Sequence, residues 1–121
     1  MASRDKIVEL NVGGSLFTTS LTTLRQYRET SMLAAMFDPD SGRPPALQDS
    51  NGAYFIDRDP KVFAIILGYL RTGRMFRRKD DGLSTEELLN EAKYFGLEGL
   101  AAELHPPDKE VLLFSMEDIN E

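Results

Sequence analysis

The chain has no cysteine, no tryptophan and only one histidine among its 121 residues. Without cysteine it has no disulfides and no thiolate metal sites. No apolar run is long enough to cross a bilayer, and the first ten residues lack the apolar centre of a signal peptide. Positive charge is also scarce, because 14 basic residues face 20 acidic ones, which argues against broad binding to nucleic acids or anionic membranes. We therefore expect a cytosolic or nuclear protein that does not insert into membranes.

The composition that remains, 41% hydrophobic and 28% charged, is ordinary for one globular domain with a modest core. Its most informative part is the stretch 51–73. An Asn-Gly turn pair opens this stretch, and residues 54–56 are of types that favour a strand. Asp59 followed by Pro60 predicts the start of a helix, which Gly73 ends. Apolar residues cover most of that helix, so we expect it in the core or at an interface.

The N-terminal part of the chain predicts a β-hairpin. Residues 7–12 alternate apolar and polar types, and residues 15–20, SLFTTS, are rich in strand formers. Gly13 and Gly14 stand between them, as in a tight two-residue turn. A phosphate-cradling loop is the functional alternative for this glycine pair. That alternative is disfavoured, because the lysine and the spacing of a P-loop are missing.

Helical patterns occupy most of the remaining chain. Short helices are predicted near residues 21–27 and 31–37, followed by an exposed loop over residues 38–50. A Ser-x-x-Glu capping box opens a helix over residues 84–95, and a last amphipathic helix covers residues 97–104. The order of hairpin, two helices, strand, long helix and two closing helices is a compact α/β layout.

The side chains offer no catalytic constellation. His105 stands beside two prolines without an evident partner for nucleophilic chemistry. Asp57 and Asp59 flank Arg58, which indicates an ion-pair corner in place of an acid/base pair. We therefore expect no enzyme activity, no cofactor and no metal site.

Several ordered motifs resemble a known family. They are VELNVGG at residues 8–14, TTSLTTL at 18–24, SMLAAMF at 31–37, the stretch from YFIDRDP to YLRTG at 54–73, and NEAKYFGL at 90–97. The chain resembles the BTB/POZ domains of the potassium-channel tetramerisation type, and most closely those of the KCTD proteins. Because these motifs occur in the same order as in that family, the match is more specific than any one motif alone.

The resemblance implies an α+β fold, with a small three-stranded sheet that includes the N-terminal hairpin, packed against about five to six short helices. It covers residues 7–104, and leaves residues 1–6 as a flexible N-terminus and residues 105–121 as a tail that is disordered or leads into a missing domain. The zinc ligands of some channel versions are absent, because there is no cysteine and His105 stands alone. A zinc-stapled subunit interface is therefore excluded.

The function implied by the resemblance is that of a homo-oligomeric adaptor. KCTD domains commonly form pentameric rings, with tetramers as the next candidate, and many act as cullin-3 adaptors or substrate receptors of a ubiquitin ligase. The alternative is a purely structural assembly module, associated with channels or receptors, that does not bind cullin. The substrate or receptor partner stays unknown, and a nucleic-acid partner has little charge support.

Asp57, Arg58 and Asp59 are the candidates for the seam between subunits, which the resemblance supports. One interpretation of this corner is a helix cap with an intrachain salt bridge. The other is a polar network at the seam, where an arginine fork fixes register. Both can hold together, because Asp59 can cap the helix while Asp57 or Arg58 reaches outward.

The candidate cullin contact lies at the end of the second short helix, where apolar anchors stand beside a polar rim. The alternative is that Leu33, Met36 and Phe37 simply form the core stripe of that helix. Further candidates are expected on the outward side of the central helix. The full set of cullin candidates is Met36, Phe37, Asp38, Pro39, Tyr69 and Arg71.

Two other features have open interpretations. A basic cluster of four arginines and a lysine spans residues 71–79, either as a solvated mixed-charge loop or as a contact for an acidic partner. The tail holds one apolar group, residues 111–114, among acidic residues. It is either a disordered extension or a segment that docks on a neighbour.

Overall fold

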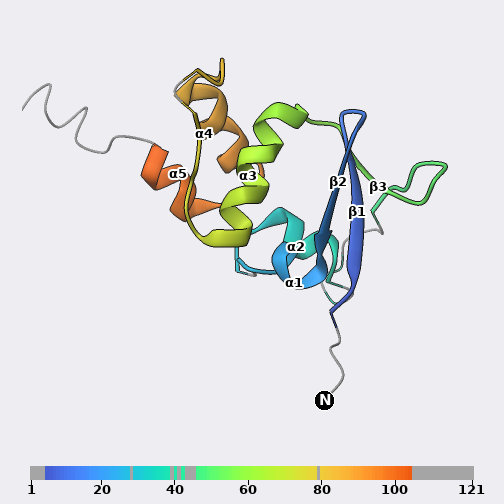
Figure 1. Cartoon of the computed structure of the whole chain (residues 1–121). Helices are drawn as coiled ribbons and strands as arrows, with labels where there is room; N and C mark the ends of the chain where they lie inside the picture. The colour runs from blue at the N-terminus through green and yellow to red at the C-terminus, as the bar shows by residue number, and fades with distance from the viewer. Residues whose placement is uncertain are drawn as a thin grey trace, which may run out of the picture.

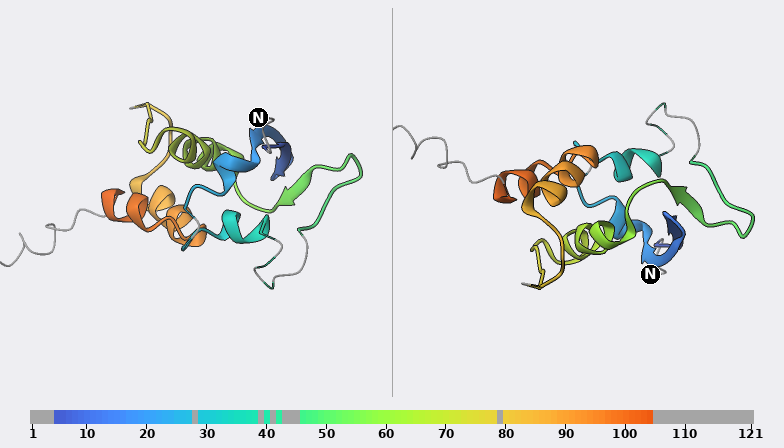
Figure 2. Two further views of the ribbon diagram at one scale, coloured as in Figure 1. Left: turned by 90° about the horizontal axis from the view of Figure 1, so that it is seen from below. Right: turned by 90° about the horizontal axis from the view of Figure 1, so that it is seen from above.

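The computed structural model of the protein describes residues 5–104, except for residues 28, 39, 41, 43–45 and 79. A three-stranded sheet lies at one side of the molecule and the helices lie at the other (Figures 1 and 2). This arrangement confirms the predicted α+β class. The elements in order are β1 (Ile7–Val12), β2 (Ser15–Ser20), α1 (Leu21–Leu24), α2 (Met32–Met36), β3 (Tyr54–Ile56), α3 (Pro60–Thr72), α4 (Thr85–Tyr94) and α5 (Glu98–Leu104).

The sheet has the strand order β2-β1-β3. β1 pairs with β2 in antiparallel fashion and with β3 in parallel fashion. Val12 lies opposite Ser15, so Gly13 and Gly14 form a two-residue turn. Their φ angles of 58° and 101° suit the turn types that match strand twist, and the predicted hairpin is confirmed.

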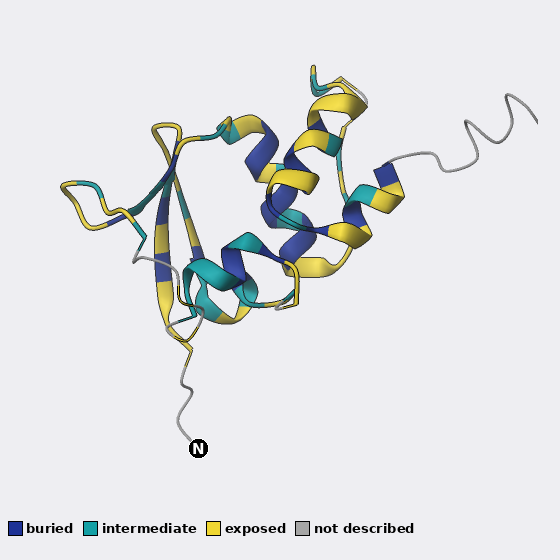
Figure 3. Cartoon of the chain, turned by 180° about the vertical axis from the view of Figure 1, so that it is seen from behind, coloured by how far each residue is buried: buried dark blue, intermediate teal, exposed yellow. Residues whose placement is uncertain are grey.

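The core lies between the sheet and α3. On β1, Val8, Leu10 and Val12 are buried on the face that looks toward the helices. α3 contributes six buried residues, as expected for a helix that is apolar over most of its surface. Figure 3 shows the buried residues along β1 and along the helix sides that face one another. Phe63 of α3 stands edge-on to Phe17 of β2 and to Phe95 after α4, at ring distances of 5.2 and 5.6 Å, and so links the sheet to the closing helices.

The helix ends follow the local signals of the sequence. Asp59 caps α3 by accepting a hydrogen bond from the Lys61 amide, with Pro60 in the first turn. Ser84 and Glu87 form the predicted reciprocal capping box at the start of α4. Within the described residues, no helix combines the length and the apolar character needed to span a membrane.

Candidate protein-interaction surfaces

The predicted seam residue Arg58 points into its own chain. Its Nε donates to Glu91 Oε1 of α4 at 3.2 Å, and its Nη2 donates to the other carboxylate oxygen. The Tyr94 ring lies over the guanidinium, with 3.8 Å from Cζ to the ring centroid. The hydrogen bond to Glu91 raises the pKa of Arg58 above its usual range. This pair fastens the corner between β3 and α3 to α4, so the charge of Arg58 is largely compensated before any partner arrives.

An intrachain salt bridge is thus present at this corner, but it joins Arg58 to Glu91 of α4, a partner that sequence reasoning missed. Glu91 lies 33 residues further along the chain, and no local pattern marks it. Asp57 and Asp59 are exposed beside Arg58. The role of these three residues at a subunit seam stays a prediction, and of the three Arg58 is the least available.

The hairpin turn packs directly against the same corner. The Gly13 amide donates to the Ile56 carbonyl at 2.9 Å, and a Cβ on Gly13 would stand 2.4 Å from the Arg58 carbonyl oxygen. Asn11 bonds in two directions, accepting from the Gly14 amide and donating to Asp49 Oδ2 at 2.8 Å. That bond is the main reason why the pKa of Asp49 lies below its usual value. The glycine pair is thus a structural turn, and the hydrogen bonds at this turn connect the β1–β2 hairpin to the residue before the corner at residues 57–59 and to the loop that contains Asp49.

The candidate cullin contact at the end of α2 is partly core. Met36 and Phe37 are half-buried, and the Phe37 ring stands edge-on to Tyr54 with 5.0 Å between centroids. Asp38 is half-buried and accepts from the Asp40 amide. Pro39 lies outside the described residues. The core interpretation therefore holds in part, and one side of these residues stays accessible.

The expectation that Tyr69 faces outward is wrong. Its side chain is buried and its ring stacks on Tyr27 at 5.4 Å. The cause is tertiary, because the link after α1 packs over this part of α3. Arg71 is exposed, and its Nη2 donates to the Thr18 carbonyl of β2 at 2.7 Å. Its contact with cullin stays a prediction, whereas Tyr69 is not available for one.

The outer sheet face is a surface that sequence reasoning missed. It consists of the side chains of the three strands that point away from the helices, together with Leu47 next to β3, whose carbonyl accepts from the Phe55 amide. Ile7, Leu16 and Leu47 are 79%, 65% and 72% exposed. The available signal was the presence of Ile7 and Leu16 at strand positions that should be polar. The members of the outer sheet face are Ile7, Glu9, Asn11, Leu16, Thr18, Ser20, Leu47 and Phe55.

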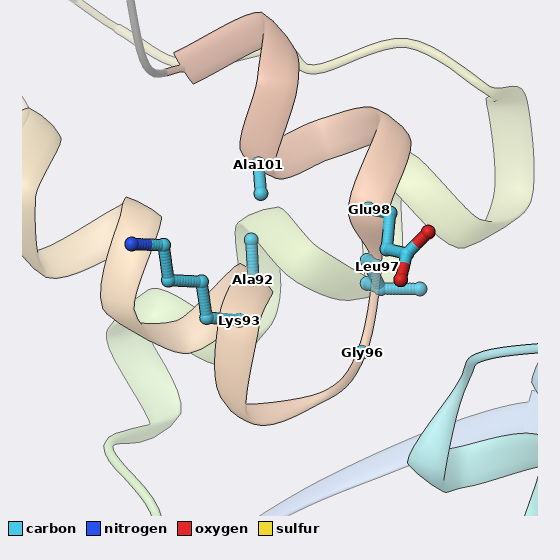
Figure 4. A pocket seen from close by; sticks show the side chains of 6 residues that line it. All are labelled: Ala92, Lys93, Gly96, Leu97, Glu98 and Ala101. Carbon is cyan, nitrogen blue, oxygen red and sulfur yellow. The ribbon is translucent and has the colours of Figure 1, made fainter.

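A shallow hollow of about 210 Å³ lies between α4 and α5 (Figure 4). Lys93 and Glu98 stand at its rim, and small or apolar residues line the remainder. The hollow is smaller than typical ligand pockets. Among the described residues, no group of three His, Cys, Asp or Glu side chains is placed to hold a metal ion.

Comparison with known proteins agrees with this description. A family model described as a BTB/POZ domain matches residues 8–105. The chain is 41% identical over 104 residues to the Mus musculus BTB/POZ domain-containing protein KCTD9, covering 86% of this chain and 30% of that protein. It is 44% identical over 110 residues to the Homo sapiens BTB/POZ domain-containing protein KCTD21, covering 91% of this chain and 40% of that protein. The chain thus spans less than half the length of these relatives.

The matched region runs from the first strand to the end of the last helix, and so includes the hairpin turn, the Arg58 corner and both closing helices. The mixed sheet with its helices on one side is the architecture that the resemblance implied. On the family match and on the similarity to the KCTD proteins, this chain belongs to the BTB/POZ domain family, in its potassium-channel tetramerisation type.

Proposed function

We propose that this BTB/POZ chain associates with copies of itself, and that the assembly serves in the cytosol or nucleus as an adaptor or substrate receptor of a cullin-3 ubiquitin ligase. The observation that carries the proposal is the family match across the whole described fold. The relatives named above are themselves BTB/POZ domain-containing proteins. Exposed apolar side chains on the described surface, among them Ile7, Leu16 and Phe76, are consistent with a protein that binds other proteins.

Self-association is supported by the outer sheet face. An antiparallel hairpin commonly has one solvated polar face, but here Ile7, Leu16 and Leu47 are exposed on it. Exposed apolar groups that share one surface mark interaction sites. Repeated contacts between unlike surfaces close into a ring, and we favour a pentamer with a tetramer as the next choice.

We propose the end of α2 as the cullin contact. Phe37 is held by Tyr54 on one side, and its half-buried ring offers a rigid apolar anchor on the other. Asp38 supplies a polar rim beside it. A rigid aromatic anchor with a polar neighbour is the usual composition of an interface hot spot.

The test combines light scattering with binding to an N-terminal fragment of cullin-3. We expect an assembly larger than a dimer and a low-micromolar affinity, about −8 kcal/mol. Phe37→Asp should abolish binding, with circular dichroism confirming the fold. Asp38→Lys, which leaves the Phe37–Tyr54 contact in place, should weaken binding.

The outcomes separate the alternatives. Unchanged binding by both variants would remove the contact from α2. An assembly that ignores cullin would favour the purely structural module. A monomer at high micromolar concentration would contradict self-association.

A further inference from the structure

The segment after α3 has an unusual two-sided form. Residues 74–78 belong to no helix or strand, and their exposure alternates along the segment. Arg74, Phe76 and Arg78 are exposed, whereas Met75 and Arg77 are half-buried. Alternation with period two is the pattern of an extended strand with one inner and one outer side.

The inner side holds the segment in place. Met75 packs against the core. Arg77 pairs with Asp81 through two bonds of 3.0 and 3.1 Å, and also donates to the Leu83 carbonyl. The pair with Arg77 is the main reason why the pKa of Asp81 lies below its usual value. The inner side therefore fixes the segment in place, and one of its three arginine charges is already paired.

The outer side is uncommitted. Phe76 is 61% exposed, which is high for a large apolar side chain. Within the described part of the chain, Arg74 and Arg78 have no side-chain partner, and the amides of residues 75–78 donate to no protein atom. This surface offers an exposed phenylalanine, two unpaired arginines and a row of unpaired backbone amides. A partner that fits it is an extended segment with both apolar and acidic side chains.

We propose that residues 110–117 of the same chain dock on residues 74–78 as an added extended strand. Between residues 105 and 121 the sequence has five acidic residues and one lysine. Glu110 and Glu117 flank the apolar group at residues 111–114. Acid, apolar and acid in this order complement Arg74, Phe76 and Arg78, so the same contact satisfies charge, apolar surface and backbone amides.

The tail starts on the side of the molecule where this segment passes. In Figures 1 and 2 the segment that follows α3 passes on the same side of the molecule as α5, at whose end, Leu104, the described part of the chain stops. Seven residue steps from Leu104 to Val111 span up to about 23 Å. A short tether also raises the effective concentration into the millimolar range, so even a weak strand contact is well populated.

The test uses the full chain with Phe114→Trp. Because the chain has no other tryptophan, its emission reports this segment alone. We expect emission shifted to shorter wavelength, as for an indole removed from water, and a return toward the exposed value in high salt. Adding Arg78→Glu should also return the emission to the exposed value. Lys61→Glu is the matched control, because Lys61 is exposed at the other end of α3, about 20 Å away, and should leave the emission unchanged.

An exposed-indole spectrum in the Phe114→Trp chain would overturn the proposal. So would equal spectra for the Arg78→Glu and Lys61→Glu variants. A further experiment tests whether the segment docks within one chain or on a neighbouring copy. The chain with both Phe114→Trp and Arg78→Glu is refolded together with a tenfold excess of unsubstituted chain. Recovery of the short-wavelength emission would assign docking to a neighbouring copy and overturn docking within one chain. The result does not depend on cullin binding or on ring size, so it stands apart from the proposed function.

Discussion

At the scale of single residues, close approach of backbones makes some glycines far more important than others. Gly73 and Gly96 both follow helices, with φ angles of 78° and 71°. A Cβ on Gly96 would lie 2.1 Å from the Thr30 carbonyl oxygen, whereas on Gly73 its nearest neighbour would be the Tyr27 hydroxyl at 3.9 Å. The two φ angles are nearly the same, and the space around the added Cβ is what differs.

We predict that Gly96→Ala destabilises the protein by roughly 3 kcal/mol or more, because backbone strain adds to a collision with the Thr30 carbonyl oxygen. Gly73→Ala carries the strain alone and should cost about 1 kcal/mol. Urea unfolding of both variants measures the difference. Equal losses would show that the turn after α4 can move away from Thr30.

The Arg58–Glu91 pair provides a second residue-scale prediction. The Glu91 side chain is 9% exposed and that of Arg58 is 30% exposed, so removing one partner strands a poorly hydrated charge. We expect Arg58→Ala to lower the free energy of unfolding by about 3 kcal/mol. Asp57→Ala, its exposed neighbour, should change it by about 0.5 kcal/mol or less.

A double-mutant cycle with Glu91→Ala isolates the interaction. The loss for the pair should be smaller than the sum of the two single losses by about 1 kcal/mol or more. Additive losses would mean that the two side chains do not interact in solution, and would return Arg58 to the list of groups free to face a neighbouring subunit.

At the scale of elements, α3 holds the fold together through contacts on several sides. Phe63 of α3 packs against Phe17 of β2, and α3 also contacts α4 and the link that follows α1. Tyr69 makes the last of these contacts. Burial, and then the Tyr27 hydroxyl, raises the pKa of Tyr69 to about 12. The fold thus keeps this phenol neutral where an unfolded chain would ionise it.

This shift predicts a loss of stability in alkali. Below pH 10 Tyr69 is neutral in both the folded and the unfolded chain and adds no pH dependence. Between pH 10 and 12 the unfolded chain ionises first, so stability falls by about 1–2 kcal/mol as pH rises through this window. Thermal unfolding at pH 8 and pH 11 measures the fall. Tyr69→Phe should reduce it, and an undiminished fall in that variant would assign it to other groups.

At the scale of the whole molecule, the outer sheet face carries exposed apolar side chains that a partner would bury. We predict that Leu16→Lys reduces the assembled mass measured by light scattering, because it puts an ammonium group into an apolar contact. Thr85→Lys, at an exposed position of α4 in the same chain, is the matched control and should leave the mass unchanged. An assembly insensitive to Leu16→Lys would place the seam on another surface.

Salt distinguishes this surface from the Arg58 corner as the seam. Apolar burial does not weaken in salt, whereas exposed ion pairs are screened. We therefore expect the assembly to persist in 1 M NaCl, where the Debye length is only about 3 Å and exposed ion pairs are strongly screened. Dissociation in salt would instead favour a seam built on Asp57, Arg58 and Asp59.

The sequence by itself determined the features that depend on neighbouring residues. The hairpin turn at Gly13, the cap at Asp59 and the capping box at Ser84 were all predictable, because turns and caps are decided within a few residues. The order of the elements and the family followed from motifs that are themselves local. The three-stranded sheet was expected from the resemblance, and the structure has it.

Only the tertiary structure decided which surfaces are free. Glu91 as the partner of Arg58, the burial of Tyr69 and the exposure of Leu16 depend on segments that are distant in the chain. A helical or strand period states which residues share a face, but it does not state which face another element covers. The contacts that cover a face are made across the fold, and for that reason the outer sheet face and the burial of Tyr69 became evident only in the folded chain.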